Sequence, residues 1–211
     1  SIISINKNKM QRTRPTSQRD QRDSREPKRT EEYAIVLDYL KHGYASPAAA
    51  TNSRPKTAIA QAIGKTHLTL LELVPKHDVF LQPNQEVYIG EGKRELIHHI
   101  KGRIPFDRLT STAAAELKHV VEKVVIDDEA RFVEFFNKAQ PLSMRMHQLE
   151  LLPGLGKKHM WEVLDARKQK PFESFADLRE RVKLLPDPKS IIIKRILSEA
   201  KGKEKYNLFV K

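Results

Sequence analysis

The spacing of hydrophobic residues divides the chain into a part that predicts strands and a part that predicts helices. Between residues 33 and 102, short apolar segments with a period of two alternate with turn residues, which is typical of β-strands. The predicted strands are residues 33–40, 57–63, 67–74, 85–89 and 95–100, with a hairpin signal at Gly64-Lys65-Thr66. Five strands this short and this closely spaced favour a small closed or partly open barrel over a two-sheet sandwich.

After Pro105 the apolar residues recur every three or four positions, which predicts helices to the end of the chain. Thr110 or Ser111 caps the first helix, and Asp127 or Asp128 starts a second one. The apolar stripes of these two helices are Leu117, Val120, Val121 and Val124, then Phe132, Val133, Phe135 and Phe136. We expect the phenylalanines to form the core that joins the barrel to the C-terminal helices.

A third helix is predicted to begin at Ser143 and to lead into a glycine-containing turn. Its apolar positions are Met144, Met146, Leu149 and Leu152. Beyond the turn, a capping box at residues 174–177 opens another helix, and the apolar positions between Ile191 and Leu197 mark a last one.

The turn has the sequence Leu-Pro-Gly-Leu-Gly-Lys-Lys over residues 152–158. Pro153 ends one helix, the glycines allow positive φ and close backbone approach, and Leu155 can enter the interhelical core. The following helix offers free N–H groups and partial positive charge to an anion. This stretch resembles a helix-hairpin-helix motif, which implies that main-chain amides hold a nucleic-acid phosphate. The predicted contacts are Gly154, Leu155, Gly156, Lys157 and Lys158; the alternative is a plain αα-hairpin whose glycines serve only packing.

A second stretch, Leu-Leu-Pro-Asp-Pro-Lys at residues 184–189, is similar to residues 151–157 but has lost the glycines. Asp187 before Pro188 is typical of a helix start, and its carboxylate would repel a phosphate. We therefore expect two stacked hairpins, of which the second has a structural role.

The distribution of charged residues distinguishes a separate N-terminal region. The chain has a net charge of +12, and its first 30 residues hold nine basic against three acidic residues, a net charge of +6. Such a segment buries too little surface to fold alone, so we expect a disordered tail that orders along phosphate backbones. The candidate contacts are Arg12, Arg14, Arg19, Arg22, Arg25, Lys28 and Arg29, with Arg103 after the last predicted strand. The alternatives are a tail that only improves solubility, or a start extended upstream of Met10.

The chain resembles an archaeal family of unknown function in the order of its features. These features are the strands, the turn at Gly90, residues Ile97–Ile100, the Phe-rich helix and residues Leu151–Lys158. The resemblance implies an OB-like barrel joined to a helix-hairpin-helix domain and described as RNA-binding. We thus predict an α+β protein: a disordered basic N-terminal tail, a small OB-like β-barrel and an all-α helix-hairpin-helix domain. The predicted boundaries are 1–32 for the tail, 33–108 for the barrel, 109–140 for connecting helices, 141–201 for the double hairpin domain and 202–211 for a basic C-terminal tail.

The function predicted from these features is non-catalytic. The sequence has no phosphate-binding glycine loop, paired-histidine zinc helix or nucleophile elbow. His98 and His99 are adjacent on a predicted strand and point to opposite faces, so we expect no metal and no cofactor. With no cysteine and no apolar run long enough to span a membrane, we expect a cytoplasmic protein that does not bind membranes.

The expected partner is RNA, specifically rRNA in a ribosomal subunit with ribosomal proteins as neighbours. A DNA-binding accessory protein of replication or repair and a protein-interaction scaffold are the alternatives, and a nuclease built on scattered carboxylates stays open.

Overall fold

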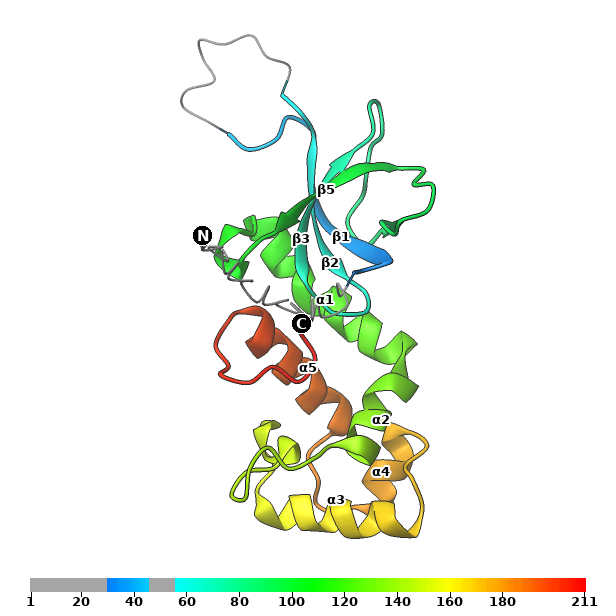
Figure 1. Ribbon diagram of the computed structural model, residues 1–211, viewed down its shortest axis with the longest axis vertical. Helices are drawn as coiled ribbons and strands as arrows, with labels where there is room; N and C mark the ends of the chain where they lie inside the picture. The colour runs from blue at the N-terminus through cyan, green and yellow to red at the C-terminus, as the bar shows by residue number, and fades with distance from the viewer. Residues whose placement is uncertain (1–29, 46–55) are drawn as a thin grey trace, which may run out of the picture.

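A curled, half-barrel sheet of five antiparallel strands forms one end of the protein (Figure 1). The computed structural model describes residues 30–45 and 56–211. The strands are β1 (Tyr33–Leu40), β2 (Ile59–Gly64), β3 (Leu70–Pro75), β4 (Glu86–Tyr88) and β5 (Ile97–Arg103), in the spatial order β4-β1-β2-β3-β5. Register shifts interrupt β1 and β3, and such bulges increase the bend and twist of a strand. The prediction of five strands is confirmed, while β4 and β5 form two edges that do not pair with each other.

Helices and the loops that connect them form the rest of the described chain, which confirms the mixed α+β class. They are α1 (Ser111–Asp127), α2 (Glu129–Lys138), α3 (Lys157–Gln169), α4 (Phe175–Arg181) and α5 (Pro188–Ala200), with the short 3-10 helices η2 (Phe106–Arg108) and η3 (Gln148–Leu151). Helix α1 lies against the sheet, and α3 lies at the end of the molecule farthest from it (Figure 1).

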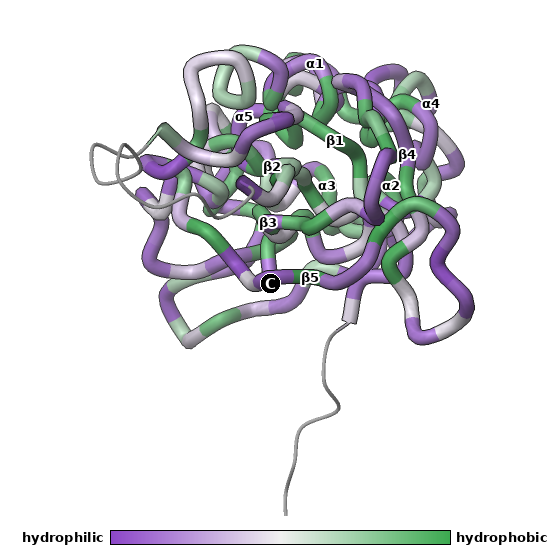
Figure 2. The backbone as a smooth tube through the Cα atoms, turned by 90° about the horizontal axis from the view of Figure 1, so that it is seen from above, coloured by the Kyte–Doolittle hydropathy of each residue, from purple (hydrophilic) through white to green (hydrophobic). Residues whose placement is uncertain are grey.

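The two faces of the central strands contribute to two different cores. Ile35, Leu37 and Ile63 face α1 and continue into one large apolar core that reaches α5. The alternate residues Ala34 and Val36 face the inside of the curled sheet. Strands β2 and β3 are buried along their whole length, and hydrophobic positions follow β1 and β3 in the view of Figure 2. Burial on both faces explains why these strands are apolar at nearly every position.

The start of α1 is fixed to the sheet by polar groups. Thr110 caps the helix as predicted, since its Oγ1 accepts a hydrogen bond from the amide of Ala113 at 3.0 Å. The same hydroxyl donates to Asp38 on β1 at 2.6 Å. Gln61, fully buried on β2, accepts from the amide of Thr110 and donates to the carbonyl of Arg108. These contacts satisfy a polar side chain that would otherwise destabilise the core.

The prediction of a helix beginning at Ser143 is wrong. Residues 141–147 form a loop, closed by a bridge between Pro141 and His147, and only the single turn η3 follows. Met144 is fully exposed, so it has no apolar surface on which to pack. The loop is stabilised instead by its own backbone, because the amide of Leu142 donates to the carbonyl of Met146 at 2.8 Å.

The residues after α5 return to the sheet. Phe209 packs against Phe132 and Phe135, with ring centroids 5.9 and 5.0 Å apart. Lys211 hydrogen-bonds to the β2–β3 turn through His67 and Thr69. Among the described residues, no helix is both long and apolar enough to cross a bilayer.

Candidate functional site

The two glycines between η3 and α3 have different backbone conformations. We call residues 152–156 the glycine turn. Gly154 has a φ of +81°, in the left-handed region that favours glycine, whereas Gly156 is extended and forms the N-cap of α3. Leu152 and Leu155 are buried, and the amide of Leu155 donates to the carbonyl of Leu152 at 3.2 Å. The turn therefore anchors its leucines in the core and leaves both glycines at the surface.

The first amides of α3 are open. Within the described residues, no acceptor bonds the amides of residues 156–159, and the regular ladder begins with Met160 donating to the carbonyl of Gly156. A Cβ added at Gly156 would meet no atom within 4 Å, so the surface in front of this N-terminus is unobstructed. Lys157 and Lys158 are exposed in the first turn. Open amides, the helix dipole and two ammonium groups together favour a bound anion here.

His147 holds the turn that precedes the glycine turn. Its Nδ1 accepts from the amide of Leu149 at 3.1 Å, and Glu150 accepts from the amide of His147 at 2.8 Å. Accepting a hydrogen bond requires an unprotonated Nδ1. Burial, followed by repulsion from Arg167, lowers the pKa of His147 and keeps the ring neutral.

A buried ion pair on α5 ties the glycine turn to the C-terminal segment. Arg195 donates to the carbonyl of Leu151, the last residue of η3, at 2.9 Å. It pairs with Glu199 at 2.9 Å, and the side chains of both residues are almost completely buried. Glu199 in turn accepts from the backbone amides of Leu208, Phe209 and Val210. The carboxylate and guanidinium are thus satisfied on all sides, and they hold η3, α5 and the C-terminal segment together.

A second turn, residues 183–187 between α4 and α5, packs beside the glycine turn. A Cβ added at Gly154 would lie 3.3 Å from Pro186, and His159 Nε2 lies 3.0 Å from the carbonyl oxygen of Leu184, to which it can only donate. Leu184 has a φ of +65°, so the second turn also contains a residue in the left-handed region, although it has no glycine. Asp187 forms the N-cap of α5 and accepts from the hydroxyl of Ser190 at 2.7 Å.

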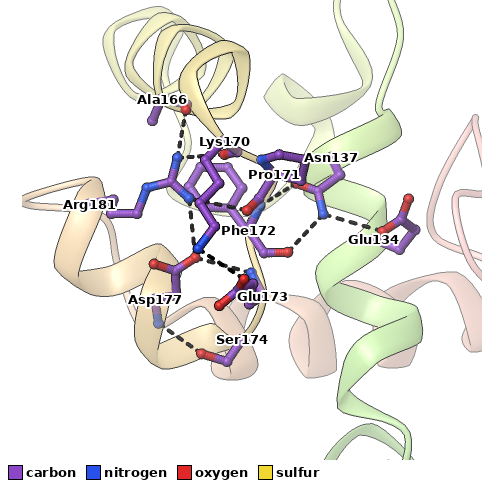
Figure 3. A network of polar contacts seen from close by, with 10 residues as sticks. All are labelled: Glu134, Asn137, Ala166, Lys170, Pro171, Phe172, Glu173, Ser174, Asp177 and Arg181. Atoms are coloured by element: carbon purple, nitrogen blue, oxygen red, sulfur yellow. Dashed lines mark hydrogen bonds and ion pairs between the residues drawn. The ribbon is translucent and has the colours of Figure 1, made fainter.

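The other end of α3 is held by Arg181 on α4 (Figure 3). Its guanidinium donates to the carbonyls of Ala166 and Lys170 at the end of α3, and it lies over the ring of Phe172 at 4.6 Å. Asn137 on α2 forms two hydrogen bonds with the backbone of Phe172, at 2.7 and 2.9 Å. Both ends of α3 are therefore fixed by specific polar contacts, which makes the surface at its N-terminus well defined.

The remaining predicted contacts lie elsewhere. Arg103 is exposed on β5, away from α3, and lines a groove of about 340 Å³ with Arg94 and Gly90. The predicted basic contacts between Arg12 and Arg29 lie outside the described residues. The structure thus brings together the five residues from Gly154 to Lys158, and it does not bring Arg103 to them.

Sequence reasoning missed Trp161, whose surface is 57% exposed on α3. The signal was present in the sequence: Trp161 is out of phase with the buried face of the helix, formed by Met160 and Val163, and in phase with Lys157 and Lys158. Among the described residues, no group of three or more histidine, aspartate or glutamate side chains could hold a metal ion.

Comparisons with known proteins agree on one family. The model of the family described as "Protein of unknown function (DUF655)" matches residues 30–211. The chain is 44% identical over 187 residues to the uncharacterized protein MJ0038 of Methanocaldococcus jannaschii, covering 88% of this chain and 82% of that one. It also resembles the crystal structure of Af1531 from Archaeoglobus fulgidus, assigned to the same family, with a TM-score of 0.73 and 40% identity over 86% of this chain and 100% of that chain.

Proposed function

The chain belongs to the DUF655 family of proteins of unknown function, and we propose that it is a non-catalytic RNA-binding protein. In this proposal residues 152–158 act as the phosphate-binding hairpin of a helix-hairpin-helix motif. The curled sheet acts as an OB-like barrel with a second contact surface, and the arginine-rich residues before Thr30 run along the RNA backbone. The RNA is rRNA, and the protein works on ribosomal subunits in the cytoplasm.

The observation that carries this proposal is the open N-terminus of α3. The amides of residues 156–159 have no acceptor within the described residues, and Lys157 and Lys158 extend from the same turn. A phosphate oxygen in front of Gly156 would accept hydrogen bonds from these amides and meet two positive charges. The exposed Gly156 lets the backbone of a nucleic acid approach closely.

Phosphate contacts position a protein on a nucleic acid without reading its sequence. The net charge of +12 favours the same class of partner, because a strongly basic protein concentrates near a polyanion. We therefore expect affinity that depends steeply on salt and weakly on sequence.

Fluorescence anisotropy of a labelled single-stranded RNA, measured across a range of salt concentrations, tests the site. Lys157→Gln combined with Lys158→Gln should weaken binding and make the slope of log K against log salt shallower by about 0.7, because the two lysines meet one phosphate and each phosphate contact on a single strand contributes about 0.7. The matched control is Lys118→Gln with Lys123→Gln, which removes the same charge from the exposed surface of α1. Equal slopes for the two double variants would refute a phosphate site at the glycine turn.

The identity of the nucleic acid is tested in two further ways. A duplex DNA of the same length, assayed alongside the RNA, should bind more weakly; tighter binding to DNA would overturn the RNA assignment. Sedimentation of a native lysate through a sucrose gradient should place the protein with a ribosomal subunit in low salt and release it in high salt. A protein that stays at the top of the gradient in low salt would refute the ribosome assignment.

A further inference from the structure

Trp161 is the single tryptophan of the chain, and it is held at the surface. Helix α3 buries Met160 and Val163, whereas Trp161 lies about 100° around the helix from Met160 and has more than half of its surface exposed. The side chain is not part of the apolar core that the described residues form. The aromatic pairs and cation–π contacts among the described residues involve other rings. Within that part of the chain, the exposed part of the indole is therefore not engaged by another ring or by a cation.

The ring adjoins the charged end of the helix. Trp161 is four residues after Lys157 and three after Lys158, the two spacings that place side chains next to each other on one helix face. Helical side chains lean toward the N-terminus, so the indole covers the turn that carries the lysines and the open amides. A flat aromatic surface thus lies one helical turn, about 5.4 Å along the axis, beyond the first lysine of the proposed phosphate site.

We propose that Trp161 stacks on an unpaired base of the strand whose phosphate is held by the glycine turn. This inference rests on the proposed function, and it names the class of ligand: single-stranded or bulged RNA rather than a continuous duplex. A duplex hides the faces of its bases against their neighbours, whereas an unpaired base exposes a π-face that an aromatic side chain can cover. Stacking of this kind tolerates every base, which agrees with a site that binds phosphates without reading sequence.

The charges along α3 limit the length of the contact. One turn beyond Trp161, Asp165 is exposed and lies 3.5 Å from Lys168, with which it forms an ion pair. A carboxylate at this point disfavours a second phosphate farther along the helix. The surface therefore accommodates one phosphate and one neighbouring base at the first two turns of α3.

The experiment uses the full chain, in which the single tryptophan reports on its own surroundings. Anisotropy of a labelled RNA measures binding, and tryptophan emission is recorded in the same titration with a single strand and with a duplex of equal length. We expect the single strand to quench the emission at saturation and the duplex to leave it unchanged. Emission that stays constant while anisotropy shows saturation by the single strand would overturn the stacking proposal and leave the phosphate site intact.

Three variants complete the test. Trp161→Ala should weaken single-strand binding by about 5- to 150-fold, the usual effect of removing one stacking ring, and should change duplex binding less than twofold. Trp161→Phe keeps a stacking surface and should recover most of the lost affinity. The control is Tyr206→Ala, which removes a partly exposed aromatic side chain from the C-terminal segment, outside the proposed RNA contacts, and should leave single-strand affinity unchanged.

The remaining outcomes separate failure of the stacking proposal from failure of the proposed function. Unchanged single-strand affinity of Trp161→Ala would refute stacking, as would an equal loss for duplex and single strand. An equal loss on both ligands would instead indicate that the indole supports the phosphate site. If the wild-type chain binds no RNA in low salt, the proposed function itself fails.

Discussion

Replacement of Gly156 by serine should stabilise the protein and weaken RNA binding at the same time. The backbone of Gly156 has φ −93° and ψ −177°, an extended conformation that serine adopts freely, and an added Cβ meets no atom within 4 Å. Serine is a preferred N-cap, because its Oγ accepts a hydrogen bond from the amide two or three residues later, here Lys158 or His159. The serine hydroxyl therefore occupies an amide that has no hydrogen-bond acceptor among the described residues of the wild-type protein.

The expected stability gain has two sources. Serine is better than glycine at an N-cap by a few tenths of a kcal/mol. Replacing glycine at a compatible backbone position adds about 0.4 to 1 kcal/mol by restricting the unfolded chain. A total near 1 kcal/mol corresponds to a rise in Tm of about 2 to 4 °C for a chain of this size.

The expected affinity loss comes from the same amide. Once Oγ occupies it, a phosphate loses one charge-assisted hydrogen bond, worth about 1.5 to 3 kcal/mol, which is a decrease of about 10- to 150-fold in affinity. Thermal unfolding and anisotropy with a single-stranded RNA measure the two effects on the same preparation. A Gly156→Ser protein with raised Tm and undiminished RNA affinity would refute the assignment of these amides to phosphate binding.

The other glycine of the turn is the matched control. Gly154 has a φ of +81°, and an alanine there would be strained by about 1 to 2 kcal/mol in addition to a Cβ 3.3 Å from Pro186. Gly154→Ala should therefore lower Tm, opposite to Gly156→Ser. The pair separates a glycine needed for the turn from a glycine needed for access to the amides.

Two further predictions concern the contacts that position α3. Burial lowers the pKa of His147, so the unfolded chain binds a proton at this residue more readily than the folded protein does. The contribution of His147 to stability should therefore be constant above about pH 6.5 and decrease as the pH drops below it. In urea unfolding at several pH values, His147→Asn, which keeps a hydrogen-bond acceptor, should lack this part of the decrease. Arg181→Ala should cost about 1 to 3 kcal/mol in the free energy of unfolding, since it removes the side-chain donor to the carbonyls of Ala166 and Lys170 and the ion-pair partner of Asp177. Arg179→Ala on the exposed side of the same helix should change it by less than about 0.5 kcal/mol, and equal costs for both variants would contradict the assigned role of Arg181.

Local signals in the sequence were sufficient for most elements. The alternation at residues 33–40 coincides with β1, and Thr110 and Ser174 cap the helices that their positions predict. The apolar stripe of α1 is buried as expected, and so is Leu155 between the two glycines. In each case the signal depends on residues within one or two turns of each other, so the wider fold does not alter it.

The loop at residues 141–147 is the segment that the local sequence pattern predicted wrongly. Met144 and Met146 have helical spacing with Leu149, yet a helix forms only where a surface exists to cover its apolar side, and Met144 is fully exposed. The cap of the short turn is the buried His147 rather than the exposed Ser143. Nothing in the spacing of the residues indicates which of the two reaches the core.

The sequence by itself determined the class of the fold, most element positions and the glycine turn with its two lysines, because these depend on neighbouring residues. Only the tertiary structure decided that β5 pairs with β3, that Arg195 and Glu199 connect η3 to the C-terminal segment, and that Gly154 packs beside Pro186. It also decided that Trp161 remains outside the core. Such contacts join residues far apart in the chain, and their free energy depends on burial that only the folded arrangement creates.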